Sequence, residues 1–587
     1  MAAFFPCLSR ISGFLFTGCP SSMPLASTSF TFDGSPLLDV CFRLQNSSSP
    51  YSRASGLVAS LSGITSPDSS CFSCWWTRTL DPTNFDLSNF TIPMDSNQST
   101  SAWTTTAACV AIVVLLILIR PRSSWGHPPL PPGPPGEFLL GHLRVIPKEN
   151  TAQTYAEWAR KYDSDVIHVK SLGQSIVVLN SVEAAKDLLD RRGANYCDRP
   201  RFTLFEVMGW GKTLTFLPFG PRWQMHRKLL QTTFSNTNVR QWYPLQVAEA
   251  RKSVHGIVSN PDRWQMSMKR FAVAIVLKVS YGVDVHEDND PYVKIAQDAM
   301  YATGNGGAPA NSIVDIFPPA RHLPVWLVRD WSLKFAREWG WAIRKLHDVP
   351  FAVAQEELAR GKDSPSFAHR LLETYSSNAK RGLDNEWSLD DIKGAAGAIF
   401  IAGADTTWAT MVVFVLNMVL HPEIQEKAQA CIERVVGLDR LPDLSDRPSL
   451  QYIDHIVQEV YRWSPLAPLG IPHKSLEDDV YNGMFIPKGS IVFFNSSAMT
   501  QDERVYKDPK SFNPDRYQPE SSGGHGEPLP LGQFGFGRRV CVGRFLADNS
   551  VWIAVATMLA TLNIGKKVGP DGQVMEPKIA FTNGGTW

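Results

Sequence analysis

The sequence has few cysteines and almost no net charge, and each scarcity excludes a class of protein. Nine cysteines occur in 587 residues, and the four beyond the first hundred residues contain no CxxC pair. A disulfide-rich scaffold is therefore excluded, and a zinc site built on that motif is not expected. Lysine plus arginine (57) nearly equals aspartate plus glutamate (56), which leaves a net charge of +1. That balance argues against nucleic acid as a partner, because such proteins carry an excess of positive charge.

Residues 1–93 lack both lysine and glutamate and are rich in serine, phenylalanine and proline. Scattered arginines among many serines are typical of organelle transit peptides. We favour another interpretation, in which residues 1–93 are a leader that need not exist in the mature protein, such as upstream sequence included by a gene model. Met94 would then begin the chain. Three glycosylation sequons precede residue 100, at Asn46, Asn89 and Asn97.

Residues 102–119 contain no charged side chain and end in a long aliphatic run. Eighteen helical residues span about 27 Å, just enough for the hydrocarbon core of a bilayer. Arg120 and Arg122 follow at once, whereas no lysine or arginine lies between Arg78 and Arg120. The positive-inside rule then predicts a single-pass anchor whose C-terminal side is cytosolic. A buried core helix is the alternative, and a cleaved signal is a further one if the chain starts at Met94.

Residues 128–136 are mostly proline, which predicts a stiff, non-helical hinge. Residues 137–587 then form one long domain, mostly α with a small β region. Apolar runs predict strands at 166–169, 175–179 and 490–494, and residues 387–421 predict one long apolar helix.

The segment around Cys541 carries the strongest chemical signal. Phe534, Gly537, Arg539, Cys541 and Gly543 form a glycine-rich, basic loop that precedes an apolar helical stretch. Glycines allow close approach of the backbone to a flat ligand. A helix N-terminus and nearby arginines favour a thiolate, and a thiolate suits a soft or borderline metal such as iron.

This segment resembles the haem-binding signature Phe-x-x-Gly-x-Arg-x-Cys-x-Gly of the cytochrome P450 monooxygenases. The surrounding sequence is similar to a fungal subgroup labelled O-methylsterigmatocystin oxidoreductase-like. The resemblance implies the mostly helical cytochrome P450 fold and haem b (iron protoporphyrin IX) as cofactor. Cys541 would be the axial ligand of the haem iron, and Arg539 would pair with a haem propionate.

A second motif, Glu459-x-x-Arg462, places an acid and a base on one helix face. Alone it predicts only a surface ion pair. In the family this pair is buried and joined by an arginine from a later loop, which Arg516 matches here. The resemblance implies a structural role for all three residues.

A third motif, Ala402–Thr407, lies within the long apolar helix, where an acid and a hydroxyl are costly unless used or satisfied. It resembles the oxygen-activating helix of the family. By that resemblance, Thr406 would hydrogen-bond the bound oxygen and Asp405 would help to deliver protons, which makes these two residues the predicted catalytic pair.

A fourth motif, Trp223-x-x-x-Arg227, places both side chains on one helix face. It resembles the family helix whose tryptophan and arginine reach a propionate. His473 occupies the position of a further propionate contact, although Lys474 follows it where many relatives have arginine.

The resemblance also implies partners. Electrons from NADPH would arrive through a cytochrome P450 reductase, with cytochrome b5 as a further donor, at the endoplasmic reticulum membrane. The reductase is acidic, and candidate residues for its docking are the basic Arg227, Lys228, Arg538 and Arg544. Apolar segments predict a lipophilic substrate such as a terpenoid, steroid or polycyclic aromatic. They are Arg199–Gly211, Ala302–Phe317, Gly394–Ala402, Leu466–Ile471 and Phe581–Asn583.

Two alternatives remain at this point. The chain ends soon after Phe581, where relatives continue through a β-hairpin, so an inactive membrane protein is one alternative. The other is a haem-thiolate isomerase or dehydratase that acts on peroxides. Asp405 and Thr406 argue against it, because such enzymes need no proton delivery to oxygen.

Overall fold

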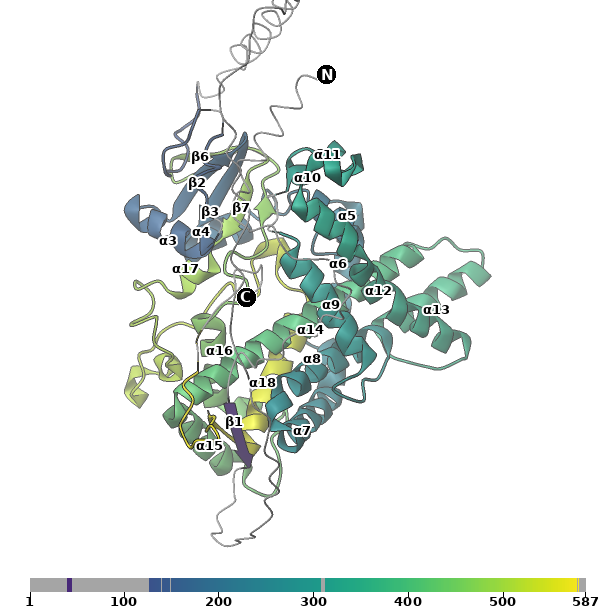
Figure 1. Ribbon diagram of the computed structural model, residues 1–587, viewed down its shortest axis with the longest axis vertical. Helices are drawn as coiled ribbons and strands as arrows, with labels where there is room; N and C mark the ends of the chain where they lie inside the picture. The colour runs from purple at the N-terminus through teal and green to yellow at the C-terminus, as the bar shows by residue number, and fades with distance from the viewer. Residues whose placement is uncertain are drawn as a thin grey trace, which may run out of the picture. The chain divides into compact units, whose positions relative to one another are not determined.

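The computed structural model describes residues 40–44, 126–138, 140–147, 149–307, 312–577 and 579 (Figure 1). The chain divides into two compact units, residues 1–46 with 129–587 and residues 47–128. All described residues except 126–128 belong to the first unit. The predicted anchor at 102–119, the three sequons and residues 581–583 lie outside the described residues, as does the predicted leader apart from residues 40–44.

Helices make up most of the domain, which confirms the predicted fold class. The longer helices are α3 (Thr151–Lys161), α6 (Pro221–Thr233), α7 (Tyr243–Ser259), α8 (Trp264–Tyr281), α9 (Pro291–Asn305), α12 (Trp331–Ala359), α13 (Phe367–Lys380), α14 (Leu389–Leu420), α15 (Pro422–Val436), α16 (Gln451–Trp463) and α18 (Arg544–Thr561). Shorter helices include α4 (Val182–Ala185), α5 (Thr203–Met208), α10 (Ile313–Ile316), α11 (Val325–Val328) and α17 (Ser496–Thr500).

Helix α14 forms the centre of the helical core, packed against α8, α9, α12 and α18 (Figure 1). It begins with a capping box, in which Ser388 and Asp391 each satisfy a backbone N–H of the other. Its axis passes close to α8, because a Cβ atom at Gly403 would lie 2.3 Å from Val276 Cγ1. Among the described residues α14 is the one helix long and apolar enough to cross a membrane. Since most of it is buried within the domain, we interpret it as a core helix.

A small β region contains the strands that the sequence predicts. The main sheet has the order β2 (Val166–Ser171), β3 (Gln174–Leu179), β7 (Ile491–Phe494) and β4 (His473–Lys474). Strands β2 and β3 form an antiparallel hairpin, whereas β3 and β7 are parallel. Strands β5 (Asp479–Tyr481) and β6 (Met484–Ile486) form a second hairpin. The β3–β7 pairing brings distant parts of the chain together beside His473.

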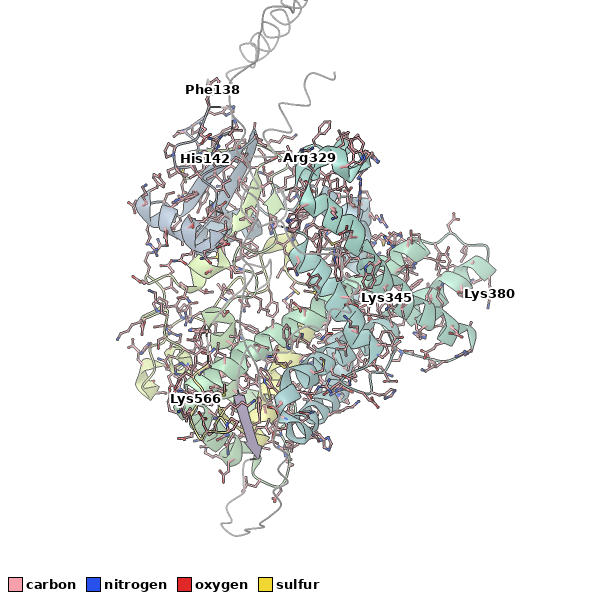
Figure 2. All side chains as sticks on the ribbon, in the orientation of Figure 1. Phe138, His142, Arg329, Lys345, Lys380 and Lys566 are labelled. Carbon is pink, nitrogen blue, oxygen red and sulfur yellow. The ribbon has the colours of Figure 1, made fainter. Side chains whose placement is uncertain are left out.

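The proline-rich segment is extended and lies against the β region. The His168 N–H donates to the Pro132 carbonyl (2.9 Å), and the Phe485 N–H donates to the Pro129 carbonyl (2.8 Å). A Cβ atom at Gly133 would lie 2.1 Å from the His168 oxygen, so only glycine allows this approach. The His142 ring, labelled in Figure 2, hydrogen-bonds the Pro134 carbonyl. These contacts fix the segment on the domain, while its role as a membrane hinge stays a prediction.

A third pair of strands joins the two ends of the sequence. Strand β1 (Val40–Leu44) pairs antiparallel with β8 (Leu562–Lys566), with Phe42 opposite Ile564. The Phe42 side chain is buried, and its ring centroid lies 5.7 Å from that of Trp264. Five residues of the predicted leader therefore contact the domain, and the interpretation of residues 1–93 as a leader stays a prediction.

Candidate functional site

The loop before α18 holds Cys541 in a fixed position. The Cys541 N–H donates to the Phe534 carbonyl (2.8 Å), which closes the loop on itself. Gly537 has φ +59°, and a Cβ atom there would lie 1.9 Å from the Leu189 carbonyl oxygen. Only glycine fits this conformation and this approach, which explains the glycine that sequence analysis selected. Phe534 packs against Tyr461 of α16, with 5.6 Å between ring centroids.

The groups around Cys541 have opposing effects on the pKa of its thiol. Desolvation by the surrounding protein raises the pKa of the Cys541 thiol although the residue keeps exposed surface, while the Gly543 N–H and the charges of Arg227 and Arg544 act to lower it. Arg227 donates to the carbonyl of the preceding residue, Val540 (2.6 Å), and Arg544 donates to the Cys541 carbonyl (3.1 Å). The Gly543 N–H and the two guanidinium charges stabilise the thiolate that forms when a metal ion displaces the thiol proton.

A buried arginine, a half-buried arginine and a buried histidine gather beside this loop. Arg539 donates to the carbonyls of Cys197 (2.7 Å) and Leu217 (3.0 Å), and its Nη2 is buried without a partner. Its guanidinium lies 4.2 Å from the centroid of the Trp223 ring on α6. His473 is buried, and its Nδ1 donates to the Tyr196 carbonyl (2.7 Å).

Arg199 is a further member of this cluster, which the sequence analysis placed at the start of a candidate substrate segment and not among the cofactor-binding residues. It is 5% exposed and donates to the carbonyls of Ile471 (2.7 Å), Pro472 (2.7 Å) and Thr215 (3.3 Å). Burial, with the charge of Arg539 next, holds the pKa of Arg199 well below its usual range. Burial, followed by the charges of Arg199 and Arg539, likewise lowers the pKa of His473 far below its ordinary value.

No carboxylate among the described residues forms an ion pair with Arg199 or Arg539. Asp198 is the nearest acid in sequence; it accepts the Phe219 N–H (2.7 Å) and acts on the two arginines through its charge alone. Buried cations without a counter-ion are costly, so this cluster suits a ligand that carries negative charge.

The motif on α14 divides between two faces. The Thr406 hydroxyl donates to the Ala402 carbonyl (2.6 Å), and Ala402 is exposed in the middle of a helix that is otherwise mostly buried. Asp405 is buried, and its Oδ2 has no hydrogen-bond partner. Burial raises the pKa of Asp405 to about 6, against an opposing effect of Lys269. Asp405 and Thr406 are thus adjacent in sequence but differ in surroundings.

These features fit a flat, dianionic cofactor whose metal takes a thiolate. Cys541 has an exposed side chain, although its loop is held between buried residues. Ala402 and Thr406 also keep exposed surface within the core helix. A cofactor that covered both would present its acidic groups to Arg199 and Arg539, and it would give the orphaned Arg539 Nη2 an acceptor. Haem has these properties.

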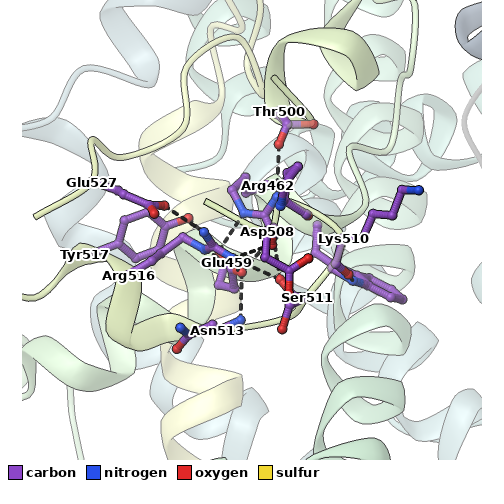
Figure 3. A network of polar contacts seen from close by, with 12 residues as sticks. Glu459, Arg462, Thr500, Asp508, Lys510, Ser511, Asn513, Arg516, Tyr517 and Glu527 are labelled. Atoms are coloured by element: carbon purple, nitrogen blue, oxygen red, sulfur yellow. Dashed lines mark hydrogen bonds and ion pairs between the residues drawn. The ribbon is translucent and has the colours of Figure 1, made fainter. Parts of the chain in front are cut away.

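A buried ionic network joins α16 to the chain segment that follows α17. Arg462 makes two hydrogen bonds of 2.8 Å to Glu459, and Arg516 donates to the same carboxylate at 3.0 Å (Figure 3). Tyr517 donates to it as well, and Glu527 accepts from Arg516 at 2.7 Å. Glu459, Arg462 and Arg516 are at most 1% exposed. The two arginines also donate to loop carbonyls, including that of Ser511, so the network ties α16 to the 500–513 segment.

A shallow groove lies on the surface beside α6 and the Cys541 loop. It is lined by Phe219, Trp223, Gln224, Arg227, Lys228, Gln231, Thr232, Gly537, Arg538 and Val540. Three of the four basic residues selected for docking line this groove, and the fourth, Arg544, follows the loop. Lys228 is mostly exposed and lies 3.6 Å from Glu386.

The candidate substrate segments differ in burial. Phe202 and Phe205 are buried and pack with Phe216, at ring centroid distances of 4.8–6.0 Å. Ile316 and Phe317, by contrast, are more than half exposed. These two residues therefore lie on the surface, and their assignment to a pocket stays a prediction.

Comparison with known proteins establishes the family. The family model described as Cytochrome P450 matches residues 131–582. The chain is 38% identical over 460 residues to cytochrome P450 monooxygenase 136 of Postia placenta, which covers 78% of this chain and 86% of that protein. It is 32% identical over 486 residues to a cytochrome P450 monooxygenase of Armillaria gallica, covering 81% and 94%. It is 34% identical over 463 residues to tryptamine 4-monooxygenase of Psilocybe cyanescens, covering 78% and 90%.

The chain therefore belongs to the cytochrome P450 family. Membership implies a haem cofactor, and the monooxygenase relatives indicate an oxidoreductase. The prediction of the family from the Cys541 signature is confirmed. The narrower fungal subgroup stays a prediction.

Proposed function

We propose that this protein is a haem-thiolate monooxygenase that inserts one atom of O₂ into a neutral, lipophilic molecule, using electrons from NADPH. The observation that carries the proposal is a pair of guanidinium groups, the buried Arg199 and the half-buried Arg539, which lie with the buried His473 beside a loop that presents Cys541. The cluster has the charge and the loop has the sulfur ligand that a haem requires.

Each residue has a defined part in this proposal. Cys541 holds the iron, and the guanidinium groups of Arg199 and Arg539 hold the propionates. When bound, haem supplies the activation of oxygen. Thr406 and Asp405 hold and pass the protons that this chemistry consumes. Trp223, Arg227 and His473 complete the propionate side, while Glu459, Arg462 and Arg516 keep the loop in place.

The two acidic residues in the described parts of the candidate pocket segments already have protein partners, which favours a neutral substrate. Glu206 is engaged by Arg201 (3.2 Å) and Arg321 (2.7 Å). Asp315 accepts the Leu204 N–H (2.9 Å). The charge of Glu206 is balanced by two arginines and Asp315 is held by a backbone N–H, so a terpenoid, steroid or polycyclic aromatic fits better than an amine. The tryptamine 4-monooxygenase relative makes tryptamine the natural comparison compound.

Electron supply through an acidic flavoprotein reductase is supported by the groove beside α6. Arg227, Lys228 and Arg538 line it, and Arg227 contacts the residue before Cys541. Complementary charge at such a surface raises the association rate and makes it sensitive to salt. Cytochrome b5, also acidic, fits the same surface.

Attachment to the endoplasmic reticulum membrane is supported by an aromatic surface as well as by the predicted anchor at 102–119. Trp326 on α11 is 74% exposed, and the exposed Ile316, Phe317 and Trp331 lie near it in sequence. Phe138 is 90% exposed and lies at the same end of the molecule as Arg329, which ends α11 (Figure 2). Clustered exposed aromatics mark a surface that meets protein or lipid. With this surface on the bilayer the catalytic domain is cytosolic, and an apolar substrate would arrive from the lipid. Fungal secondary metabolism or xenobiotic oxidation would use such a reaction.

The decisive experiment is the carbon monoxide difference spectrum of reduced membranes that contain the full chain. A band at the long-wavelength position of a thiolate ligand, absent in Cys541→Ser, is the expected result. No band at all would make the protein an inactive member of the family. If the band is present, turnover with NADPH, reductase and O₂ supports oxygenation. Turnover of peroxide without NADPH would instead identify an isomerase or dehydratase.

A further inference from the structure

The surroundings of Asp405 are unusual for a buried acid. The residue is 8% exposed, and its Oδ2 has no hydrogen-bond partner in the described part of the chain. A buried carboxylate normally pairs with a cation or accepts several hydrogen bonds, because desolvation strongly disfavours its charge. Asp405 therefore depends on whatever charge lies within reach on the helices around α14.

That charge is Lys269 on α8. The Lys269 Nζ lies 4.0 Å from the centroid of the Trp408 ring, which is a close cation–π contact. Trp408 follows Asp405 by three residues on α14, so the two side chains share a face of the helix. The positive charge of Lys269 acts on Asp405 through space and opposes the effect of burial. In return, burial lowers the pKa of Lys269 and Asp405 raises it.

Among the described residues, several ion pairs lie at the N-terminal end of α14, some turns before Asp405, and His421 with Glu423 lies at its C-terminal end. The N-terminal pairs are Lys212 with Asp390 (2.7 Å), Lys393 with Asp348 (2.8 Å), and Asp391 with Arg222 (2.7 Å) and His226 (3.0 Å). The buried His347 lies against Gly397, also before Asp405. Among the described ionisable groups, Lys269 is the one whose charge affects Asp405.

We propose that Lys269 is a positioning residue for proton delivery, which sets the charge state of Asp405 from α8 while Trp408 holds its ammonium in place. The inference rests on the proposed monooxygenase function and deepens it. A carboxyl group passes protons best when it is neither permanently ionised nor permanently neutral near the working pH. Burial alone would keep Asp405 neutral, and a tight ion pair would keep it ionised. An ammonium held on an aromatic ring nearby gives the intermediate case.

The direct test is an infrared titration of the Asp405 carboxyl in the full chain, isolated as the difference between each protein and its Asp405→Asn counterpart. Lys269→Met is expected to raise the titration midpoint by about one pH unit, because the positive charge that favours the ionised carboxylate is lost. Lys269→Arg keeps the charge and should stay near wild type. Lys278→Met, on the same helix and paired with Asp284, is the matched control and should not move the midpoint.

Substitution of Trp408 should shift the Asp405 titration midpoint in the opposite direction. Trp408→Leu removes the ring that holds the ammonium, so Lys269 is free to approach the carboxylate, and the midpoint should fall. An unchanged midpoint in Lys269→Met would overturn the proposal, and an unchanged or raised midpoint in Trp408→Leu would overturn the holding role. The carbon monoxide band of each variant reports whether it still binds haem.

Turnover supplies the second measurement. In Lys269→Met, the fraction of consumed NADPH that appears as product should reach its maximum at a higher pH than in wild type, because Asp405 ionises later. The maximum should return in Lys269→Arg. If the protein gives no thiolate band, the proposed function fails, yet the infrared titration still decides whether Lys269 controls Asp405.

Discussion

At the scale of single residues, the site is defined by two guanidinium groups that form no ion pair among the described residues. Arg199 and Arg539 have only backbone carbonyls as acceptors, and His473 is kept neutral beside them. Glu459 is the opposite case, since two arginines and a tyrosine satisfy it completely. The arginines beside Cys541 are suited to bind a ligand, whereas the Glu459 network stabilises the fold. Substitutions should separate these two kinds of buried charge.

Arg199→Met should weaken haem binding without unfolding the protein. Loss of a charge-assisted hydrogen bond to a propionate costs about 2 kcal/mol, or about thirtyfold in haem affinity. Stability of the haem-free protein should change little, because removing an uncompensated buried charge offsets the loss of three carbonyl contacts. Haem titration and urea unfolding of the haem-free protein measure the two effects. Arg201→Met, two residues on and mostly exposed, is the control. Equal loss of stability with and without haem would contradict this role.

Glu459→Gln should destabilise the protein by about 3–5 kcal/mol, since it leaves two buried arginines without their counter-ion. The free energy of unfolding from urea titration measures this effect. Glu356→Gln breaks an exposed pair with Arg360 (2.6 Å) and should cost less than about 0.5 kcal/mol. Similar small effects in both variants would show that the network contributes nothing to stability.

At the scale of elements, α14 depends on its N-terminal cap. Burial raises the pKa of Asp391, but hydrogen bonds from Ser388, His226 and Arg222 lower it well below its usual range. An acid whose pKa is depressed by folding contributes stability above its unfolded pKa and loses it as pH falls. Wild type should therefore lose stability progressively below about pH 5. Asp391→Asn should be less stable by about 1 kcal/mol at neutral pH and should show a shallower acid loss. Unfolding measured across that range checks both, and parallel curves would contradict the assignment.

Strand β1 is the second element whose contribution can be measured. Phe42 is buried against Trp264, so Phe42→Ala should destabilise the domain by about 3 kcal/mol and speed hydrogen exchange of the β8 amides. Phe138→Ala removes the same ring from a side chain that is 90% exposed and should change neither. No effect of Phe42→Ala would mean that β1 does not cover β8 in solution.

At the scale of the whole molecule, local sequence patterns predicted individual helices and strands, whereas features that depend on long-range contacts were not predicted. The apolar run at 387–421 predicted α14 because its length and lack of polar periodicity allow only a buried or membrane helix. The β-rich runs predicted β2, β3 and β7 for the same local reason. The Cys541 signature identified the family because its spacing depends on neighbouring residues alone.

Arg199 and Lys269 were not selected because their partners lie far away in the sequence. Arg199 is fixed by the Ile471 and Pro472 carbonyls, and Lys269 by a ring on another helix. Neither arrangement leaves a periodic pattern. The β1–β8 pairing could not be predicted for the same reason, because the five residues of β1 form a strand by pairing with a segment more than 500 residues away.

The exposed aromatic surface gives a last prediction at this scale. Helices α10 and α11 lie at one end of the molecule, whereas α15 lies toward the other (Figure 1). If the α10–α11 end rests on the bilayer, a photoactivated probe dissolved in the lipid should label Trp326 and Trp331 in membranes that hold the full chain. Leu438, which follows α15 and is 68% exposed, is the matched control and should stay unlabelled. Since exposed apolar side chains react alike with such a probe, equal labelling at both ends would mean that the aromatic surface does not face lipid. The domain would then be held at the membrane by its predicted anchor alone.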